Sequence, residues 1–204
     1  MTKATVYVVD DDQAVRDSLG LLLRSVGLPC QLFESGQAFL DAWQDDWYGC
    51  LLLDIRMPGM SGMELHERLR ERHISIPVIF VTGHGDVPMA VEAMRNGAFD
   101  FIQKPYRDQE LLDRVNQALN WEASHRSMEN RRRELQQRYE SLTPREREVM
   151  ECVVRGLANK VIAMDLELSQ RTVEIHRARV MEKMGARSLA ELVRMALALE
   201  EEDS

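Results

Sequence analysis

Over the first 121 residues, short apolar runs alternate with longer stretches in which apolar residues recur every three or four positions. The apolar runs have the length of buried strands and cover residues 5–9, 30–33, 50–54, 78–82 and 99–103. The stretches between them have helical spacing and cover residues 14–25, 36–44, 61–72 and 88–96. This alternation predicts an α/β domain over residues 1–121, with a five-stranded parallel sheet covered on both faces. For its topology we expect the flavodoxin-like strand order 2-1-3-4-5.

A long helix is predicted after the fifth strand, because residues 106–143 contain no proline and no glycine. Its first part carries an amphipathic stripe that belongs to the first domain and consists of Leu111, Leu112, Val115, Ala118 and Leu119. Residues 122–141 form a predicted helical linker, in which Met128 and Leu135 begin a weak seven-residue repeat that ends at Leu142. Two hypotheses stay open for this segment: a solvated charged helix or flexible connection, and a rigid helix that pairs with its copy in a dimer.

Residues 142–204 have the pattern of an all-α domain with four short helices. Capping boxes are predicted at the starts of the first and the last helix, over residues 143–146 and 188–191. The two middle helices are predicted over residues 159–164 and 170–184. The short turn between these middle helices indicates a helix-turn-helix.

Composition narrows the class of protein. The chain has 204 residues, 45% of them hydrophobic and 29% charged, and no apolar stretch is long enough for a transmembrane helix. The N-terminus lacks the features of a signal peptide, and the three cysteines fit neither a disulfide framework nor a zinc site. We therefore expect a cytoplasmic protein with no membrane partner.

The net charge of −8 is unevenly distributed along the chain. Residues 1–121 hold 11 basic and 18 acidic side chains, whereas residues 142–199 hold 10 basic and 8 acidic ones. An acidic first domain can therefore accompany a mildly basic one that binds nucleic acid.

Acidic side chains close two of the predicted strands. Asp10 and Asp11 follow the first strand, and Asp54 ends the third strand before a Pro-Gly loop. The carboxyl ends of parallel strands form the crevice in which open α/β sheets bind ligands, so the three acids are expected to converge. Clustered carboxylates repel one another unless a cation compensates, and Mg²⁺ prefers such oxygen ligands and often holds a phosphate as well.

Two further strands end in groups that suit a phosphoryl group. Thr82 ends the fourth strand, and Lys104 follows the fifth strand directly before Pro105. A hydroxyl and an ammonium at the same sheet edge suit the additional oxygens of a phosphoryl group. Each residue alone has a structural explanation, and Asp12 is a candidate helix cap, but the combination predicts a magnesium site with a reactive carboxylate at Asp54.

Segments 8–11, 53–62, 82–86 and 104–105 resemble the receiver domain of bacterial two-component response regulators. Residues 82–94 together with Phe101 resemble the FixJ subgroup. The resemblance implies that Asp54 accepts a phosphoryl group from a partner sensor histidine kinase. Such a protein phosphorylates itself and slowly dephosphorylates itself at this residue, and is not a turnover enzyme on an outside substrate.

The same resemblance assigns roles to the residues around Asp54. It implies Mg²⁺ held by Asp10, Asp11, Asp54 and the backbone carbonyl of Arg56. It implies that Thr82 and Lys104 bind the phosphoryl oxygens. It also implies that Phe101 is the switch aromatic, the aromatic side chain that turns inward in the active state. It also implies a cis peptide bond between Lys104 and Pro105.

The third predicted helix of the C-terminal region has the features of a DNA-reading helix. Val173, Val180 and Met184 form its core stripe. The opposite face carries Glu174, Ile175 and Ala178 beside arginines, which is unusual for a solvated face and suits the major groove of DNA. We predict that phosphates are contacted by Lys160, Arg171, His176, Arg179 and Lys183. The alternative is a small helical interaction domain in which Ile175 contacts a protein partner.

Segments 142–146, 159–163 and 172–176 resemble the LuxR/NarL-type helix-turn-helix, which implies DNA binding and adds Thr172 to the predicted DNA-binding residues. Glu174 stands at a position where this class also has lysine, so a base preference is not carried over. The remaining histidines show no spacing typical of metal ligands and are expected at the surface or in loops: His66, His73, His84 and His125.

These patterns together predict a response regulator that dimerises on phosphorylation and binds two-fold symmetric promoter DNA, with RNA polymerase as a further partner. The expected dimer face comprises the fourth helix, fifth strand and fifth helix, including Val91 and Met94. Two other hypotheses stay open. A phosphatase with an aspartyl nucleophile is disfavoured, because Arg56 stands where the haloacid dehalogenase pattern needs a second aspartate. The other is a receiver with a protein-binding or RNA-binding output.

Overall fold

The computed structural model describes residues 4–83 and 87–200. The chain divides into two compact units, Met1–Arg126 and Ser127–Ser204, which are taken in turn. None of the helices in the described ranges is both long enough and apolar enough to cross a membrane.

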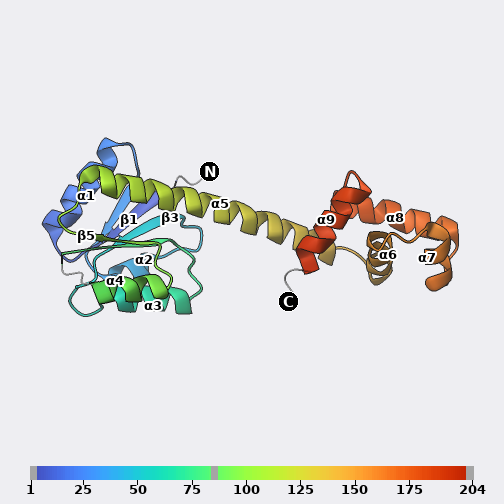
Figure 1. Ribbon diagram of the computed structural model, residues 1–204, viewed down its shortest axis with the longest axis horizontal. Helices are drawn as coiled ribbons and strands as arrows, with labels where there is room; N and C mark the ends of the chain where they lie inside the picture. The colour runs from blue at the N-terminus through green and yellow to red at the C-terminus, as the bar shows by residue number, and fades with distance from the viewer. Residues whose placement is uncertain (1–3, 84–86, 201–204) are drawn as a thin grey trace. The chain divides into compact units, whose positions relative to one another are not determined.

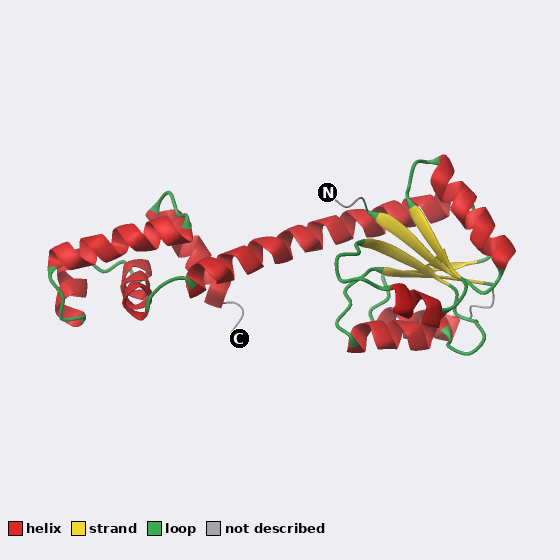
Figure 2. Cartoon of the chain, turned by 180° about the vertical axis from the view of Figure 1, so that it is seen from behind, coloured by secondary structure: helices red, strands yellow, loops and turns green. Residues whose placement is uncertain are grey.

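A five-stranded parallel sheet forms the centre of the first unit (Figure 2). Its strand order β2-β1-β3-β4-β5 confirms the predicted topology. The strands are β1 (Thr5–Val9), β2 (Cys30–Phe33), β3 (Gly49–Leu53), β4 (Val78–Thr82) and β5 (Asp100–Gln103). Strand β3 lies one residue earlier than predicted, so Asp54 is the first residue beyond the strand and not its last.

Helices cover both faces of this sheet, and each face has its own apolar core (Figure 1). The helices are α1 (Gln13–Ser25), α2 (Gly36–Ala42), α3 (Gly62–Glu71), α4 (Val87–Arg95) and α5 (Asp108–Glu140). Because side chains alternate across a strand, Tyr7 and Val9 pack on the side of α2 and α3, whereas Val6 and Val8 pack on the side of α1 and α5. Burial on both faces explains why β1 and β3 are continuous apolar runs in the sequence.

The second unit is all-α, as predicted. It contains the end of α5 and α6 (Pro144–Val154), α7 (Asn159–Asp165), α8 (Gln170–Met184) and α9 (Leu189–Glu200). Helices α7 and α8 are joined by a four-residue connection and form the predicted helix-turn-helix. Helix α8 ends where Gly185 takes up a left-handed conformation, with φ of 69°.

The two predicted capping boxes have different outcomes. At α6 both reciprocal bonds between Thr143 and Glu146 are present. At α9 the Ser188 hydroxyl accepts from the Glu191 N–H, but the Glu191 carboxylate accepts from the N–H of Arg187 and not of Ser188. The second box is therefore only half formed.

Helix α5 continues through the segment predicted as a linker, up to Glu140. Its last turns belong to the core of the second unit, because Leu135 and Tyr139 pack against the buried residues there. Leu135 and Leu142, which are seven residues apart, therefore both pack in the core of the helical domain, where Leu142 is 3% exposed.

Candidate functional site

Two acids lie side by side at the carboxyl edge of the sheet. Asp10 directly follows β1 and Asp54 directly follows β3, and the register of these paired strands aligns Val9 with Leu53. The Asp54 N–H donates to the Val9 carbonyl at 2.9 Å, which continues the ladder by one step and fixes the position of the acid. Both side chains are buried, with exposures of 4% for Asp10 and 8% for Asp54.

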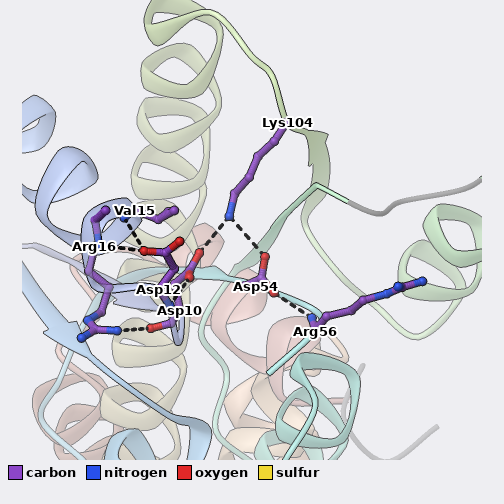
Figure 3. A network of polar contacts seen from close by, with 8 residues as sticks. Asp10, Asp12, Val15, Arg16, Asp54, Arg56 and Lys104 are labelled. Atoms are coloured by element: carbon purple, nitrogen blue, oxygen red, sulfur yellow. Dashed lines mark hydrogen bonds and ion pairs between the residues drawn. The ribbon is translucent and has the colours of Figure 1, made fainter. Parts of the chain in front are cut away.

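Lys104 brings the two acids together. Its Nζ lies 2.9 Å from Asp10 Oδ2 and 3.3 Å from Asp54 Oδ1 (Figure 3). The lysine follows β5 and precedes Pro105 through a cis peptide bond, as predicted. Since Lys104 comes from the far edge of the sheet and reaches across to acids on β1 and β3, it acts as the internal counter-ion of the site.

Burial and the neighbouring charges have opposing effects on the pKa values of Asp54 and Lys104. Burial raises the pKa of Asp54, and the neighbouring Asp10 raises it further. Lys104 and the N–H of Arg56, which donates to Asp54 Oδ2 at 2.7 Å, lower that pKa but do not cancel the rise. Burial lowers the pKa of Lys104, whereas its contacts with the two acids raise it more strongly, so the ammonium stays charged. The site therefore has an excess of negative charge that a cation can neutralise.

The other acids of the predicted cluster lie at the surface. Asp11 is exposed, and Asp12 accepts from the N–H groups of Ala14 and Val15 and caps α1. Within residues 4–83 and 87–200, no three His, Cys, Asp or Glu side chains lie close enough to hold a metal ion by themselves. The two converging carboxylates fit a cation that takes its remaining ligands from backbone carbonyls, water and phosphate, as Mg²⁺ does. The Arg56 side chain points away from the acids, so only its backbone is placed to take part (Figure 3).

Thr82 and Phe101 come from the neighbouring pair β4 and β5. Thr82 is fully buried at the end of β4, and its carbonyl accepts from the Lys104 N–H at 2.8 Å. Phe101 lies opposite Phe80 in the register of the two strands and is half-buried against the core on the side of α2 and α3. The structure thus places Thr82 directly beside Lys104, and Phe101 on the strand that leads to Lys104.

Sequence reasoning missed one contact at this site. Arg16, on the first turns of α1, donates from Nη1 to the Asp10 carbonyl at 2.7 Å. The contact holds the end of β1 against α1. The sequence does not predict this contact, because the position of an arginine on a helix surface does not determine which acceptor its guanidinium contacts.

In the second unit, α8 presents the predicted face to solvent. Val173, Val180 and Met184 are buried and form the predicted core stripe. Ile175 is 47% exposed, and the other residues predicted to face the DNA bases, Glu174 and Ala178, are exposed as well. Of the predicted phosphate contacts, Lys160, Arg171 and Arg179 are exposed and His176 is half-buried, as is Thr172, the further predicted DNA-binding residue.

Lys183, a predicted phosphate contact, also has partners inside the domain. Its Nζ donates to Glu146 Oε2 at 2.6 Å and to the Ser141 carbonyl at 3.0 Å, so it holds α8 against the start of α6. Its ammonium is engaged inside the domain but stays partly exposed, with 34% of the side chain accessible, so its contact with DNA stays a prediction. A second missed contact joins the helix-turn-helix itself: Arg177 Nη1 donates to Asn159 Oδ1 at 2.7 Å, across α8 and α7.

Comparison with known protein families gives two matches. Residues 6–116 match the response regulator receiver domain, and residues 140–196 match the luxR family of bacterial regulatory proteins. The first match lies in the first compact unit and the second match lies in the second unit. Residues 117–139 of α5 lie between the two matches.

Similar proteins of nearly the same length are known. The transcriptional regulatory protein FixJ of Azorhizobium caulinodans is 52% identical over 94% of this chain and 91% of its own length. FixJ of Bradyrhizobium diazoefficiens is 47% identical over 96% of both chains. Among solved structures, the response regulator StyR has a TM-score of 0.91 with 45% identity over 96% of this chain and 98% of its own.

Proposed function

The chain belongs to the family of two-component response regulators that join a receiver domain to a LuxR-family DNA-binding domain, and on this basis we propose that Asp54 is the residue that accepts the phosphoryl group. A receiver joined to a DNA-binding domain implies a partner kinase and promoter DNA, and the output is control of transcription. The contact of Lys104 with both Asp10 and Asp54 is the observation that carries the proposal. It gathers a nucleophile, a second acid and a cation at the sheet edge where such folds bind ligands.

The chemistry follows from the surroundings of Asp54. Its carboxylate oxygen attacks the phosphorus of a phosphohistidine on the kinase, a P–O bond forms, the P–N bond breaks, and the imidazole leaves. Lys104, already held 3.3 Å from Asp54, donates to an oxygen of the incoming group, and the Thr82 hydroxyl binds another. The only covalent chemistry is phosphorylation and slow hydrolysis at Asp54, so the protein turns over no outside substrate.

We propose that Asp10, Asp11, Asp54 and the backbone carbonyl of Arg56 hold Mg²⁺. The raised pKa of Asp54 supports this, because a cation at that position stabilises the ionised carboxylate. When bound, the ion supplies positive charge that offsets the repulsion between the carboxylates and the phosphoryl group.

Phosphorylation would shift an equilibrium between two states of the receiver. Phe101, half-buried beside the site, is the aromatic that we propose to report this change. The proposed outcome is a dimer through α4, β5 and α5, where Val91 and Met94 expose 43% and 46% of their surface. A dimer presents two α8 helices to two half-sites about one DNA turn apart.

The exposed face of α8 supports direct reading of base edges. We propose that Glu174, Ile175 and Ala178 face the bases, while Lys160, Arg171, Thr172, His176 and Arg179 position the domain on phosphates. RNA polymerase is a further proposed partner at the promoter. Because chromosomal DNA is its target, we propose that the protein acts in the cytoplasm.

The test uses the full-length protein treated with acetyl phosphate and DNase footprinting on its own promoter region. We expect protection of a two-fold symmetric site that depends on phosphorylation, and no such gain for Asp54→Asn. Asp45→Asn is the matched control, since Asp45 is an exposed acid in the loop after α2.

Two results would contradict the proposal. One is an Asp54→Asn protein that still gains dimers and footprints when phosphodonor is added. The other is the absence of any DNA footprint together with phosphorylation-dependent capture of a protein or RNA, which would favour a different output.

A further inference from the structure

A cavity of about 400 Å³ opens at the amino end of β4 and β5, at the sheet edge opposite Asp54. Its wall is formed by the last turns of α3, the loops that lead into β4 and β5, and Trp121 on α5. All of these residues belong to the first unit. The volume is typical of sites that hold a small organic molecule.

One polar side chain of the cavity wall has no partner among the described residues for its ring nitrogens, and neither nitrogen is fully buried. His66, expected at the surface, is only 5% exposed and packs edge-to-face on Phe80, with 5.6 Å between the ring centroids. None of the described residues hydrogen-bonds its ring nitrogens. Burial lowers the pKa of His66, and the positive charge of Arg70 lowers it further, so the ring is neutral with one donor and one acceptor. An imidazole that lines a cavity and makes no hydrogen bond within the described residues is available to bind a ligand there.

The cavity also contains a cation without a counter-ion. Arg70 lies one helical turn after His66 on α3, is exposed, and makes no ion pair within the described ranges of the chain. A guanidinium is suited to bind a carboxylate through two parallel hydrogen bonds. The polar groups of the cavity thus favour an anionic group on the ligand.

The opposite wall is aromatic. Trp121 is 37% exposed and contacts Phe99, with ring centroids 6.0 Å apart. His125 stacks on the same indole at 3.8 Å between centroids, which holds the ring in place. Leu69 and Ile76 are buried among the residues that line the cavity. Such walls favour a flat apolar body on the ligand.

We propose that this cavity binds a small planar aromatic carboxylate, with its carboxylate on Arg70 and the His66 ring, and its aromatic body against Trp121. The carboxylate accepts hydrogen bonds from the Arg70 guanidinium and from the one N–H of the neutral His66 ring, and the aromatic ring of Trp121 covers the body of the ligand. The site lies away from Asp54, Lys104 and the proposed metal ligands, so it does not compete with phosphorylation.

The probe is 2-naphthoate, titrated into the full-length protein by isothermal calorimetry, with neutral 2-naphthamide as its uncharged partner. We expect saturable binding of 2-naphthoate at one site. Arg70→Gln should weaken this binding about tenfold or more, because it removes a charge-assisted bidentate contact, and should leave 2-naphthamide nearly unaffected. Arg72→Gln is the matched control, since Arg72 is an exposed arginine at the end of the same helix and does not line the cavity.

A second measurement needs no substitution. The His66 ring signals in ¹H–¹⁵N NMR spectra should move on addition of 2-naphthoate, together with the amides of residues 96–99. The proposal is overturned if no saturable binding occurs, if Arg70→Gln binds as tightly as the unmodified protein, or if the shifts centre on Lys104. Thermal unfolding and phosphorylation by acetyl phosphate check that each variant is folded.

Discussion

At the scale of single residues, burial of Asp54 opposes the ionisation of its carboxyl group. A carboxyl group whose pKa is raised by folding costs stability in its ionised form. This cost is fully present above the raised pKa, declines as the pH falls below it, and is gone below the ordinary value of 3.8. Asp54→Asn removes the charge and keeps an oxygen that accepts from Arg56. We therefore expect Asp54→Asn to raise the free energy of unfolding of the receiver at pH 7 in metal-free buffer, and we expect this gain to vanish below about pH 4.

The measurement is urea unfolding followed by tryptophan fluorescence. Trp43, Trp47 and Trp121 all lie in the first unit, so this signal reports the receiver alone. Adding Mg²⁺ should stabilise the unmodified protein and reduce its difference from Asp54→Asn. Asp45→Asn should change stability little in either buffer. A loss of stability in Asp54→Asn would mean that the charge of Asp54 is fully compensated by Lys104.

A second residue-scale prediction concerns Glu146 and Lys183. The hydrogen bond from Lys183 and the capping contact with Thr143 lower the pKa of Glu146 from 4.5 to about 2. A lowered carboxyl pKa contributes stability that is full above about pH 4.5 and is lost as the pH falls toward 2. Lys183→Met leaves a buried carboxylate without its cation, so we expect a loss of about 2 kcal/mol at pH 7 and a smaller decline in acid.

Far-UV circular dichroism is the appropriate signal, because the second unit has no tryptophan. Lys160→Met, at an exposed lysine of α7, is the control and should keep the acid dependence of the unmodified protein. Equal acid dependence in Lys183→Met would show that the ion pair does not set the pKa of Glu146.

At the carboxyl edge of the sheet, the sequence predicts the positions of the residues at strand ends. Asp54 and Lys104 could be placed because the end of a buried apolar run is visible in the sequence and all parallel strands deliver such ends to one edge. Lys183 and His66 could not, because helical spacing gives the face of a helix but not the element that covers it. Lys183 lies on the outer face of α8 by spacing, and only the fold shows that Glu146 reaches it.

At the scale of elements, the start of α3 is fixed by contact with the segment that carries Asp54. Gly62, the first residue of α3, has no room for a side chain, because a Cβ there would overlap the Asp54 carbonyl oxygen. Its N–H donates to the Ile55 carbonyl at 2.9 Å, so helix and loop are held at backbone distance. Gly62→Ala must move α3 or Asp54, and we expect it to cost about 2 kcal/mol of receiver stability.

The same displacement should slow phosphorylation by acetyl phosphate, because the geometry around Asp54 changes. Gly83→Ala is the control for stability, since a Cβ at that position meets nothing within 4 Å. Unchanged unfolding in Gly62→Ala would show that the loop between β3 and α3 adjusts freely.

Element boundaries were predicted less well than element types. The positions of β1, β2 and β4 match because turn residues or acids flank their apolar runs. The β3 shift arose because Gly49 pairs with Thr5 in the sheet, and glycine carries no apolar signal. The capping box at α9 is only half formed because the Glu191 carboxylate accepts from the N–H of Arg187 and not from that of Ser188. The spacing of residues in the sequence does not distinguish between these two adjacent N–H groups.

At the scale of the whole molecule, the protein combines an acidic receiver with a DNA-binding unit of little net charge. Residues 142–199 carry only two more basic than acidic side chains, so phosphate attraction from one copy is weak. Two copies double the number of phosphate contacts. Affinity for DNA would therefore rise most on dimerisation, and this is the physical reason for our proposal that control acts there.

The substitution Val91→Glu at the proposed dimer face tests whether dimerisation raises the affinity for DNA. Two-fold symmetry puts equivalent surfaces of the two copies against each other, so an added charge is repelled by its counterpart. We expect dimerisation of the phosphorylated protein to weaken about tenfold or more in analytical ultracentrifugation, with the rate of phosphorylation unchanged. The dependence of DNA binding on salt should fall to about half its slope, because one domain contacts half as many phosphates.

Leu21→Glu is the control, since Leu21 is 69% exposed on α1, outside this face. If Val91→Glu dimerises normally and keeps the full salt dependence, the copies meet through another surface, and the exposure of Val91 and Met94 has a different explanation.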